Sequence, residues 1–314
     1  MRTPLRPTDT EGVPSSRRSI SDPDVQAYLD WVRVECGAAE NTLKAYRADL
    51  ALYLQQLPGQ RAASAEPEHV LEFLAAEQQR GMSPRTCARR LVAVRCLHRW
   101  LASERRMDDD PAARIEGPEL WDRLPHCLQL QEVDRLLEPP EERTPPTLRA
   151  QAVLEVLYAC GLRASEVAHL RISAVRFDEA LLRTTGKGGK DRVVPFGRRA
   201  AAALHDWLDE GRPQLASAAA TPTDPVFLSD RGRPLSRDGV WRIVRRRADA
   251  AGVAGKVSPH TLRHSFATHL LHGGANLRWV QAMLGHASLR TTQIYTRVDS
   301  ERMRSTHAQF HPRG

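Results

Sequence analysis

The chain has 314 residues, of which 41% are hydrophobic and 5% aromatic, and its formal net charge is +8. This length predicts about two domains, with enough apolar material for two cores. The Arg-rich positive charge favours an anionic partner such as nucleic acid or a membrane surface, and the low aromatic content argues against base stacking as the main mode of binding.

Other sequence features exclude several classes of protein. No apolar run approaches the ~20 residues that cross a bilayer, and the first twenty residues carry charge without the apolar segment of a signal peptide. The five cysteines show no CxxC pair and no histidine at zinc-finger spacing, which is typical of reduced thiols. We therefore expect a cytoplasmic protein in which residues 1–20 form a disordered tail.

Residues 21–104 are predicted to form a first domain that is helical throughout. Helices are expected to start at Ser21–Pro23, near Pro67 and at Ser83–Pro84, and Asn41 is a candidate cap for the second helix. That helix has the most regular apolar spacing in the chain, namely Leu43, Tyr46, Leu50, Tyr53 and Leu57.

The fourth predicted helix is rich in arginine, with few acids among them. Its arginines form either a solvated polar face or a surface for the DNA backbone, and the scarcity of acids favours the second interpretation. The residues concerned are Arg85, Arg89, Arg90, Arg95 and Arg99.

Residues 105–125 contain a run of three Asp, three Pro and a Gly, which predicts an interdomain linker. The second domain then covers residues 126–314 and is mainly α-helical with a small antiparallel β-sheet, so the fold class is α+β. Strands are expected at Leu181–Thr185 and Arg192–Phe196, around a Gly-Lys-Gly-Gly-Lys turn, with a further short strand at Asp224–Ser229. The expected helices are Gln131–Leu137, Thr147–Cys160 (ended by Gly161), Ser165–Leu170, Ser236–Ala251 and an amphipathic piece at Glu301–Phe310.

The stretch from Ser258 to Thr296 places several polar side chains at the ends of short helices. Ser258 can cap a helix on which His260 and Arg263 share one face, because they are three residues apart. The next helix is expected from Asn276 to Gly285, a good left-handed cap, directly before His286, and Ser288 can cap a short helix that carries Tyr295. Cationic groups that hold phosphate oxygens and a hydroxyl that attacks phosphorus suit a phosphodiester substrate.

Five motifs occur in a fixed order: Gly161-Leu162-Arg163-Ala164-Ser165-Glu166, Gly186-Lys187-Gly188, His260-Thr261-Leu262-Arg263, Leu284-Gly285-His286 and Tyr295. In this order and with these residue types, the chain resembles the tyrosine site-specific recombinase (phage integrase) family and, within it, the Xer branch. The resemblance covers about residues 20–311. It implies a helical, SAM-like core-binding domain and a catalytic domain that together clamp duplex DNA.

The resemblance also implies the catalytic roles. Tyr295 would attack phosphorus and form a 3′-phosphotyrosyl bond, which preserves the bond energy for rejoining without ATP. His260 would be the base, Lys187 would protonate the leaving 5′-oxygen, and His286 would donate a hydrogen bond. Arg163 and Arg263 would bind the non-bridging oxygens, so that no cofactor and no metal are expected.

Each of these residues also has a simpler interpretation. Glu166 can orient either Arg163 or His260, and Lys190 competes with Lys187 for the acid role. His264 and His269 are expected to be structural, and a zinc site at His260 and His264 is disfavoured because Arg263, and no Glu, lies between them.

The resemblance further implies partners: a double-stranded, dif-like DNA site, a second XerC-like recombinase in a heterotetramer, a septal DNA translocase as activator, and no membrane. The reaction would resolve chromosome or plasmid dimers at cell division. A mobile-element integrase, a type IB topoisomerase and a non-catalytic DNA-binding protein on the same fold are the alternatives. The end segment Glu301–Phe310 would pack on a neighbouring subunit or within its own chain, and we expect Tyr295 to be displaced from the arginines in an isolated monomer.

Overall fold

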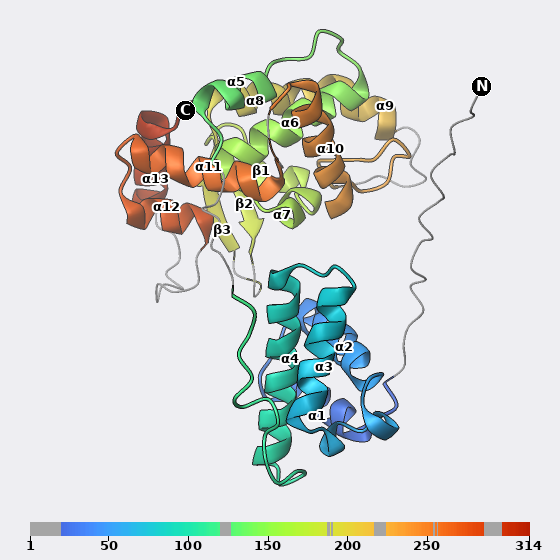
Figure 1. Ribbon diagram of the computed structural model, residues 1–314. Helices are drawn as coiled ribbons and strands as arrows, with labels where there is room; N and C mark the ends of the chain where they lie inside the picture. Colours follow the sequence, from blue (N-terminus) through green and yellow to red (C-terminus); the bar gives the residue numbers. More distant parts are fainter. Residues whose placement is uncertain are drawn as a thin grey trace, which may run out of the picture. The chain divides into compact units, whose positions relative to one another are not determined.

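The computed structural model describes residues 20–119, 127–186, 189, 191–216, 224–253, 255, 257–285 and 297–314. The chain divides into two compact units, the N-terminal unit (residues 1–123) and the C-terminal unit (residues 124–314). In Figure 1 the N-terminal unit is drawn in blue to green and the C-terminal unit in green to red.

The N-terminal unit is a helical bundle. Its helices start at the predicted prolines: Asp22 Oδ1 accepts a hydrogen bond from the Asp24 N–H (2.8 Å), and Ser83 Oγ accepts one from the Thr86 N–H (3.2 Å). The prediction that Asn41 caps the second helix is wrong, because the extended residue before that helix is Ala39. The helices are α1 (Pro23–Val34), α2 (Glu40–Leu54), α3 (Pro67–Gln79) and α4 (Pro84–Ser103), with short 3₁₀ turns η1 (Pro58–Gln60) and η2 (Ala62–Ser64).

The arginines of α4 are largely engaged inside the N-terminal unit. Arg89 Nη2 lies 3.0 Å from Asp49 Oδ1, Arg90 pairs with Glu77, and Arg95 donates to the backbone carbonyl of residue 115. A carboxylate cannot be buried without a cationic or hydrogen-bonding partner, and Asp49 and Glu77 are 3% and 1% exposed. Three of the five arginines thus bind groups of their own unit. The Arg89 side chain is still 50% exposed, and Arg85 and Arg99 are exposed, so the DNA-facing surface on α4 stays a prediction.

The described part of the predicted linker, residues 105–119, packs against the N-terminal unit. It has no helix, and it contributes Ala112 and Ile115 to the buried core of that unit. The Arg106 guanidinium lies 5.1 Å from the centre of the Trp100 ring and 2.7 Å from Asp24 Oδ1. This segment thus continues the fold of the first unit.

The C-terminal unit is built around α6 (Pro145–Cys160), which Figure 1 shows in the middle of the surrounding helices. Nearly every residue of α6 from Leu148 onward is buried, in keeping with a helix that is apolar around its circumference. It ends at Gly161 as predicted, with a left-handed φ of 56°. A Cβ at Gly161 would lie 2.4 Å from Phe266 Cδ1, so both the backbone and the packing require glycine there.

The small sheet is antiparallel, with strand order β1-β2-β3. The strands are β1 (Val175–Arg176), β2 (Leu181–Thr185) and β3 (Asp191–Pro195). The predicted hairpin is confirmed, but the predicted strand at Asp224–Ser229 is wrong: Pro225 and Leu228 make only isolated bridges. Pro225 lacks an N–H and cannot continue a ladder. The predicted fold class, mainly α with a small antiparallel sheet, is confirmed.

Helices complete the C-terminal unit around α6 and the sheet. Within the described ranges, every helix is too short or too polar to cross a bilayer. The remaining elements are α5 (Leu130–Leu136), α7 (Ala164–Ala168), η3 (Ile172–Ala174), α8 (Arg198–Asp206), the π-helical turn η4 (Trp207–Gly211), α9 (Arg212–Ala216), α10 (Arg237–Ala250), α11 (Pro259–His272), α12 (Leu277–Leu284) and α13 (Arg297–Phe310).

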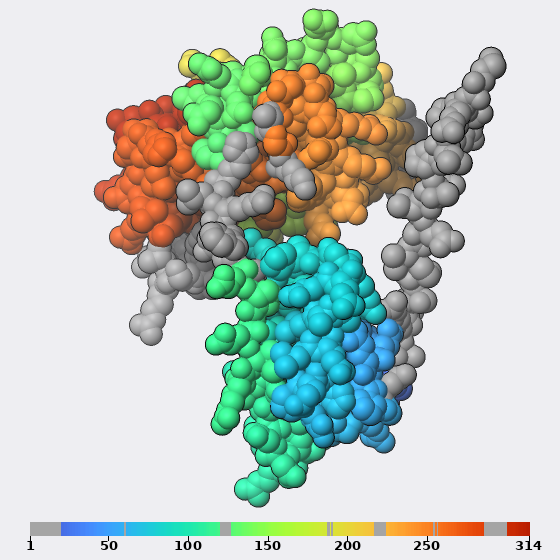
Figure 2. Space-filling model, viewed as in Figure 1, coloured from blue at the N-terminus to red at the C-terminus, as the bar shows by residue number. Residues whose placement is uncertain are grey.

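The end helix α13 packs within its own chain, which is the second of the two predicted alternatives. Met303 is fully buried, His307 Nε2 lies 2.8 Å from the Ala159 carbonyl, and Arg313 Nη2 lies 3.0 Å from Glu155 Oε1. In Figure 2 the orange and red atoms of the last helices form one continuous block of the C-terminal unit.

Candidate active site

Arg163 is presented by the tight turn between α6 and α7. Gly161 turns the chain, and Arg163 is the extended residue that precedes α7, as predicted. Its N–H donates to Glu166 Oε2 (2.8 Å) and its Nη1 donates to Glu166 Oε1 (2.8 Å). The Arg163 side chain is still 30% exposed, so it is held in one direction and remains accessible to a ligand.

Glu166 is held from its other side by Arg192 on β3. Arg192 Nη1 donates to Oε1 (2.8 Å) and Nη2 to Oε2 (2.7 Å), and both side chains are 3% exposed. A carboxylate has about four acceptor positions, and two donors at each oxygen fill them. Of the two partners predicted for Glu166, the structure therefore has Arg163 and not His260.

The protonation of Glu166 follows from these bonds. Burial raises the pKa of the Glu166 carboxyl, but the hydrogen bonds and charge of Arg192, together with the bonds from Arg163, bring it below its usual value. Glu166 is thus ionised at neutral pH and has no free acceptor position, so it orients cations and does not transfer protons.

Arg263 lies on α11, which begins as predicted: Ser258 Oγ accepts from the Thr261 N–H (3.1 Å) and Pro259 is the first helical residue. Its Nη1 donates to the Gly161 carbonyl (2.5 Å) and its Nη2 to the Leu284 carbonyl (2.6 Å). Burial and the nearby charges of Arg163 and Arg192 lower the pKa of Arg263 to about 9. Arg263 therefore stays charged at neutral pH, in an environment where positive charges outnumber the one carboxylate of Glu166.

The end of α12 is fixed to the same place. The helix starts next to Asn276 and ends at Gly285, as predicted: Asn276 accepts from the Arg278 N–H (2.9 Å), and Gly285 has a φ of 67°. Arg192 Nε donates to the Met283 carbonyl (2.7 Å), and a Cβ at Gly285 would come within 2.9 Å of Arg192 Cδ. The chain therefore leaves α12 toward residue 286 from a defined position.

His260 lies one turn before Arg263 on α11 and is exposed. Its ring centre lies 6.5 Å from that of Trp241 on α10. His269 is structural, as predicted: Tyr158 Oη lies 2.8 Å from its Nδ1, and its Nε2 lies 2.9 Å from the Leu128 carbonyl. His264 is half-buried.

Three of the six predicted catalytic residues, namely Lys187, His286 and Tyr295, lie outside the described residues, as do Lys190 and the short helix predicted from Ser288. In the part of the chain that the structure describes, no group of three or more His, Cys, Asp or Glu side chains could hold a metal ion.

We call Arg163, Glu166, Arg192 and Arg263 the Glu166 cluster. Its three guanidinium groups and one carboxylate leave a surplus of two positive charges. Such a surplus in a partly buried place is costly unless an anion completes it. Guanidinium groups hold phosphate oxygens in pairs, so the cluster is suited to a phosphate-containing ligand.

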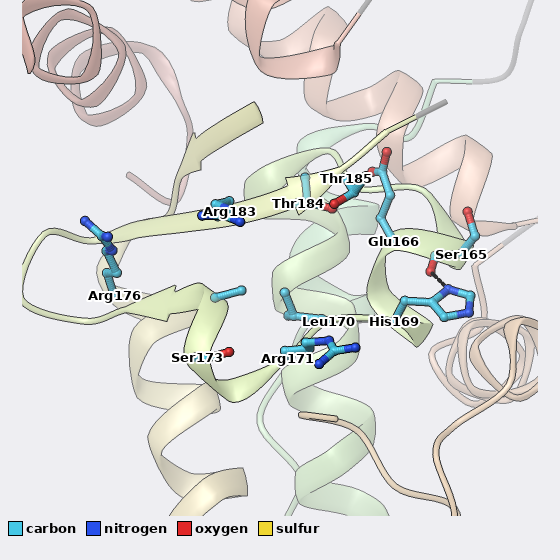
Figure 3. Close-up of a pocket in the computed structure, with 11 residues that line it drawn as sticks. Ser165, Glu166, His169, Leu170, Arg171, Ser173, Arg176, Arg183, Thr184 and Thr185 are labelled. Atoms are coloured by element: carbon cyan, nitrogen blue, oxygen red, sulfur yellow. Dashed lines mark hydrogen bonds between the residues drawn. The ribbon is translucent and has the colours of Figure 1, made fainter. Parts of the chain in front are cut away.

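A groove of about 590 Å³ adjoins the cluster, between α7 and the strands β1 and β2. Figure 3 shows Arg171, Arg176 and Arg183 around it, with Glu166 toward the end of β2. Each of these arginines has a carboxylate nearby, at Asp224 (3.3 Å), Glu179 (2.9 Å) and Asp191 (3.3 Å) respectively. The groove arginines are thus charge-balanced, and the surplus lies at the Glu166 cluster.

Arg192 is a member of the site that was not predicted from the sequence. One signal was present: in the alternating strand Asp191–Pro195 the inward positions are Arg192 and Val194, and a buried arginine on the apolar side of a strand requires an anionic partner.

Residues 126–302 match the model of the Phage integrase family, and residues 25–105 match the model described as Phage integrase, N-terminal SAM-like domain. The chain is 40% identical over 294 residues to a protein named Tyrosine recombinase XerD of Halalkalibacterium halodurans, covering 92% of this chain and 98% of that one. It is 42% identical over 295 residues to a protein of the same name from Yersinia pestis, covering 93% and 98% of the two chains.

Among solved structures, the fold is similar to that of XerH site-specific recombinase bound to a palindromic difH substrate, with a TM-score of 0.66 and 24% identity. That match covers 90% of this chain and 83% of the other. A lambda integrase dimer bound to a core site gives a TM-score of 0.62 at 16% identity, covering 86% and 98% of the two chains.

Proposed function

The chain belongs to the phage integrase family of tyrosine recombinases, and we propose that it is a site-specific recombinase that cuts and rejoins duplex DNA through a 3′-phosphotyrosyl bond on Tyr295. The observation that carries the proposal is the surplus positive charge of the Glu166 cluster. Arg163 is aimed by Glu166, and Arg263 is aimed by two backbone carbonyls. Guanidinium groups fixed in this way can stabilise the charge that develops on the phosphate oxygens during cleavage.

The chemical step uses the residues that the motifs identify. Tyr295 Oη attacks phosphorus, the bond from phosphorus to the 5′-oxygen breaks, and the 3′-phosphate remains on the tyrosine. A phenol has a pKa near 10, so His260, exposed and one turn from Arg263, accepts its proton. Lys187 protonates the departing 5′-oxygen, and His286 donates a hydrogen bond to the phosphate. Rejoining is the reverse reaction with a new 5′-hydroxyl, and needs neither ATP nor a metal ion.

The biological role that we propose is the resolution of chromosome or plasmid dimers. The support is the 40–42% identity to proteins named Tyrosine recombinase XerD over nearly their whole length. In this proposal the enzyme is cytoplasmic and acts at a dif-like site as a heterotetramer with a XerC-like recombinase, activated by a septal DNA translocase. The two units, with the division near the predicted linker 105–125, would enclose the duplex as a two-domain clamp.

Covalent trapping tests the proposal. Genomic DNA fragments are incubated with the protein in EDTA, and the fragments that remain attached after denaturation are sequenced. We expect attachment at one sequence through a tyrosine ester, none with Tyr295→Phe, and unchanged attachment with the control Tyr46→Phe, which removes a phenol hydroxyl in the N-terminal unit. An adduct formed by Tyr295→Phe would assign another nucleophile, and loss of the adduct in EDTA would overturn the metal-free mechanism.

The trapped sequence also tests the biological role. Recovery of a single chromosomal site with two unequal half-sites, one for each recombinase, agrees with dimer resolution by a heterotetramer. Recovery of the ends of a mobile element would instead assign the chain to integration.

A further inference from the structure

Arg192 donates hydrogen bonds both to Glu166 and to the end of α12. It comes from β3 (Asp191–Pro195), just after the turn that carries Lys187 in the sequence. It binds both oxygens of Glu166 on α7, its Nε donates to the Met283 carbonyl near the end of α12 (2.7 Å), and its Cδ lies against Gly285. One guanidinium group thus joins three segments that each lie next to a predicted catalytic residue in the sequence: β3 follows Lys187, α7 follows Arg163 and α12 precedes His286.

Stability alone does not explain these contacts. A buried ion pair is weak evidence for stability, because the loss of hydration offsets much of the attraction, and a well-packed apolar side chain often serves as well. Val194, two residues along the same strand, is fully buried and shows that this face accepts an apolar residue. What an apolar residue at position 192 could not do is hold Glu166 and the end of α12 in one orientation.

The effect of Arg192 passes through Glu166 to Arg163. Four donated bonds saturate Glu166, two from Arg192 and two from Arg163. Without Arg192, the carboxylate would be buried with half of its acceptor positions empty, and it could rotate or take up a proton. In either case Arg163 would lose its fixed direction, and fixed donors are what distinguish a charge-stabilising site from an ordinary patch of cations.

We propose that Arg192 is a positioning residue for strand cleavage: it aims Arg163 through Glu166 and sets the exit of the chain from α12 toward His286, without touching the DNA. Its own five N–H donors are mostly used on protein groups, and its side chain is 3% exposed. This inference rests on the proposed function, since the orientation of Arg163 matters only if Arg163 binds the scissile phosphate.

The test compares two substrates that differ at the scissile phosphate. One duplex carries the ordinary phosphodiester, and the other carries a methylphosphonate, in which a methyl group replaces one charged oxygen. An arginine that neutralises this oxygen matters less when the charge is absent. Single-turnover cleavage rates are measured for wild type, Arg163→Ala, Arg192→Gln and Arg192→Lys, with DNA affinity measured in parallel.

Arg149→Gln is the matched control. Arg149 is also a buried arginine of the C-terminal unit (6% exposed), and it too binds a backbone carbonyl, that of Leu228 (2.8 Å), and a carboxylate, Asp230 (2.8 Å). Neither of these bonds involves a residue of the Glu166 cluster. The Arg149→Gln variant therefore shows how far the cleavage rates change when any buried arginine is removed.

We expect Arg192→Gln to cleave the phosphodiester roughly 10–100-fold more slowly, the usual effect of removing a residue that orients a reacting group, with DNA affinity within about threefold of wild type. Its ratio of phosphodiester to methylphosphonate rates should fall as in Arg163→Ala, whereas Arg149→Gln should keep the wild-type ratio. Arg192→Lys keeps the charge but cannot form both bonds to Glu166, and should show the same fall.

Three results would overturn the inference: a wild-type ratio in both Arg192 variants, an equal fall in Arg149→Gln, or failure of both Arg192 variants to fold, which would make Arg192 a folding residue. The failure of the proposed function is a different result, namely no covalent adduct with wild-type protein on either substrate.

Discussion

The two units contain buried clusters of arginine and carboxylate that differ in their balance of charge. In the N-terminal unit, Asp49 and Glu77 are surrounded by Arg80, Arg89 and Arg90, and we call these five residues the Asp49–Glu77 cluster. Two of its arginines are half-exposed, with side chains 56% and 50% accessible, so their charge is shared with water. In the Glu166 cluster, one carboxylate faces three arginines, two of them buried.

The pKa values show the consequence of this difference. Burial raises the pKa of the Asp49 carboxyl, and the bonds and charges of Arg89 and Arg90 only partly oppose it. In the C-terminal unit the cations prevail: the pKa of Glu166 is lowered, and the pKa of Arg263 falls to about 9 through burial and repulsion by its neighbours. The first cluster needs its arginines to bury acids, whereas the second holds arginines that still need an anion.

The first prediction breaks the N-terminal cluster. Glu77→Gln leaves Arg90, whose side chain is 13% exposed, with only Asp49 (3.6 Å from Nε) as a buried counter-charge, and removal of one partner from a buried pair typically costs about 3–5 kcal/mol. We expect a loss of this size in the free energy of unfolding of the N-terminal unit, measured by urea denaturation. Glu68→Gln, on the exposed side of the same helix, is the control and should change little. Equal effects of the two substitutions would mean that the pair contributes nothing.

The second prediction concerns the Glu166 cluster, where a substitution should lower the cleavage rate more than the stability. Arg163→Ala should lower the single-turnover cleavage rate about 10²–10³-fold, as does loss of one donor to a developing charge, while the unfolding free energy changes by less than in Glu77→Gln. Arg171→Ala, an exposed arginine at the nearby groove, is the control. If Arg163→Ala lowered the free energy of unfolding by more than the free energy that corresponds to its loss of cleavage rate, both clusters would be structural.

A third prediction concerns the contact between Arg192 and the end of α12. Gly285→Ala adds a Cβ that would lie 2.9 Å from Arg192 Cδ, at a φ of 67°. We expect a cost of roughly 1–3 kcal/mol and slower cleavage. Gly252→Ala has a similar φ of 60° but open space around it, so it measures the backbone cost alone. If the two variants cleave DNA equally well, Arg192 does not control the end of α12.

The fourth prediction compares the acid sensitivity of the two units. Burial lowers the pKa of His98 in the N-terminal unit to about 4, and in the C-terminal unit it lowers the pKa of His307 to about 4 and also that of His269 and His311. A folded pKa below the unfolded value of about 6.5 means that the unfolded state binds more protons. Stability is therefore present above pH 6.5 and is lost as pH falls toward 4.

Each such histidine contributes up to about 1.4 kcal/mol per pH unit. As pH falls, the unfolding free energy of the C-terminal unit should therefore decrease about two to three times more steeply than that of the N-terminal unit. Urea unfolding at pH 7 and pH 5, followed by hydrogen exchange in α4 and α6, measures both slopes. His307→Phe should reduce the slope of the C-terminal unit, and the exposed control His205→Gln should not. Equal slopes in the two units would contradict the prediction.

Local chemistry made much of the fold predictable. Ser258 with Pro259, Gly161 and Gly285 are signals that act within one turn of a helix, and the structure has the predicted starts and ends at each. Contacts between residues distant in sequence were not predicted. The acids that bind the arginines of α4, Asp49 and Glu77, come from other helices.

Arg192 was missed for the same reason, since its partners Glu166 and Met283 are 26 and 91 residues away. Strand periodicity could place Arg192 on the buried side but could not name the carboxylate there. The predicted positions of Arg163 and Arg263 near the starts of their helices were correct. The bonds that orient Arg263 depend on the carbonyls of Gly161 and Leu284, which no sequence pattern marks.

The most direct test of the central claim, that the unbalanced cluster holds the scissile phosphate, is a crystal structure of the protein on its DNA site with vanadate at the cleavage position. We predict guanidinium nitrogens of both Arg163 and Arg263 within roughly 2.7–3.1 Å of vanadate oxygens, Tyr295 Oη in line with the leaving 5′-oxygen, and Arg192 still bound to Glu166. A vanadate that neither arginine reaches would contradict the account.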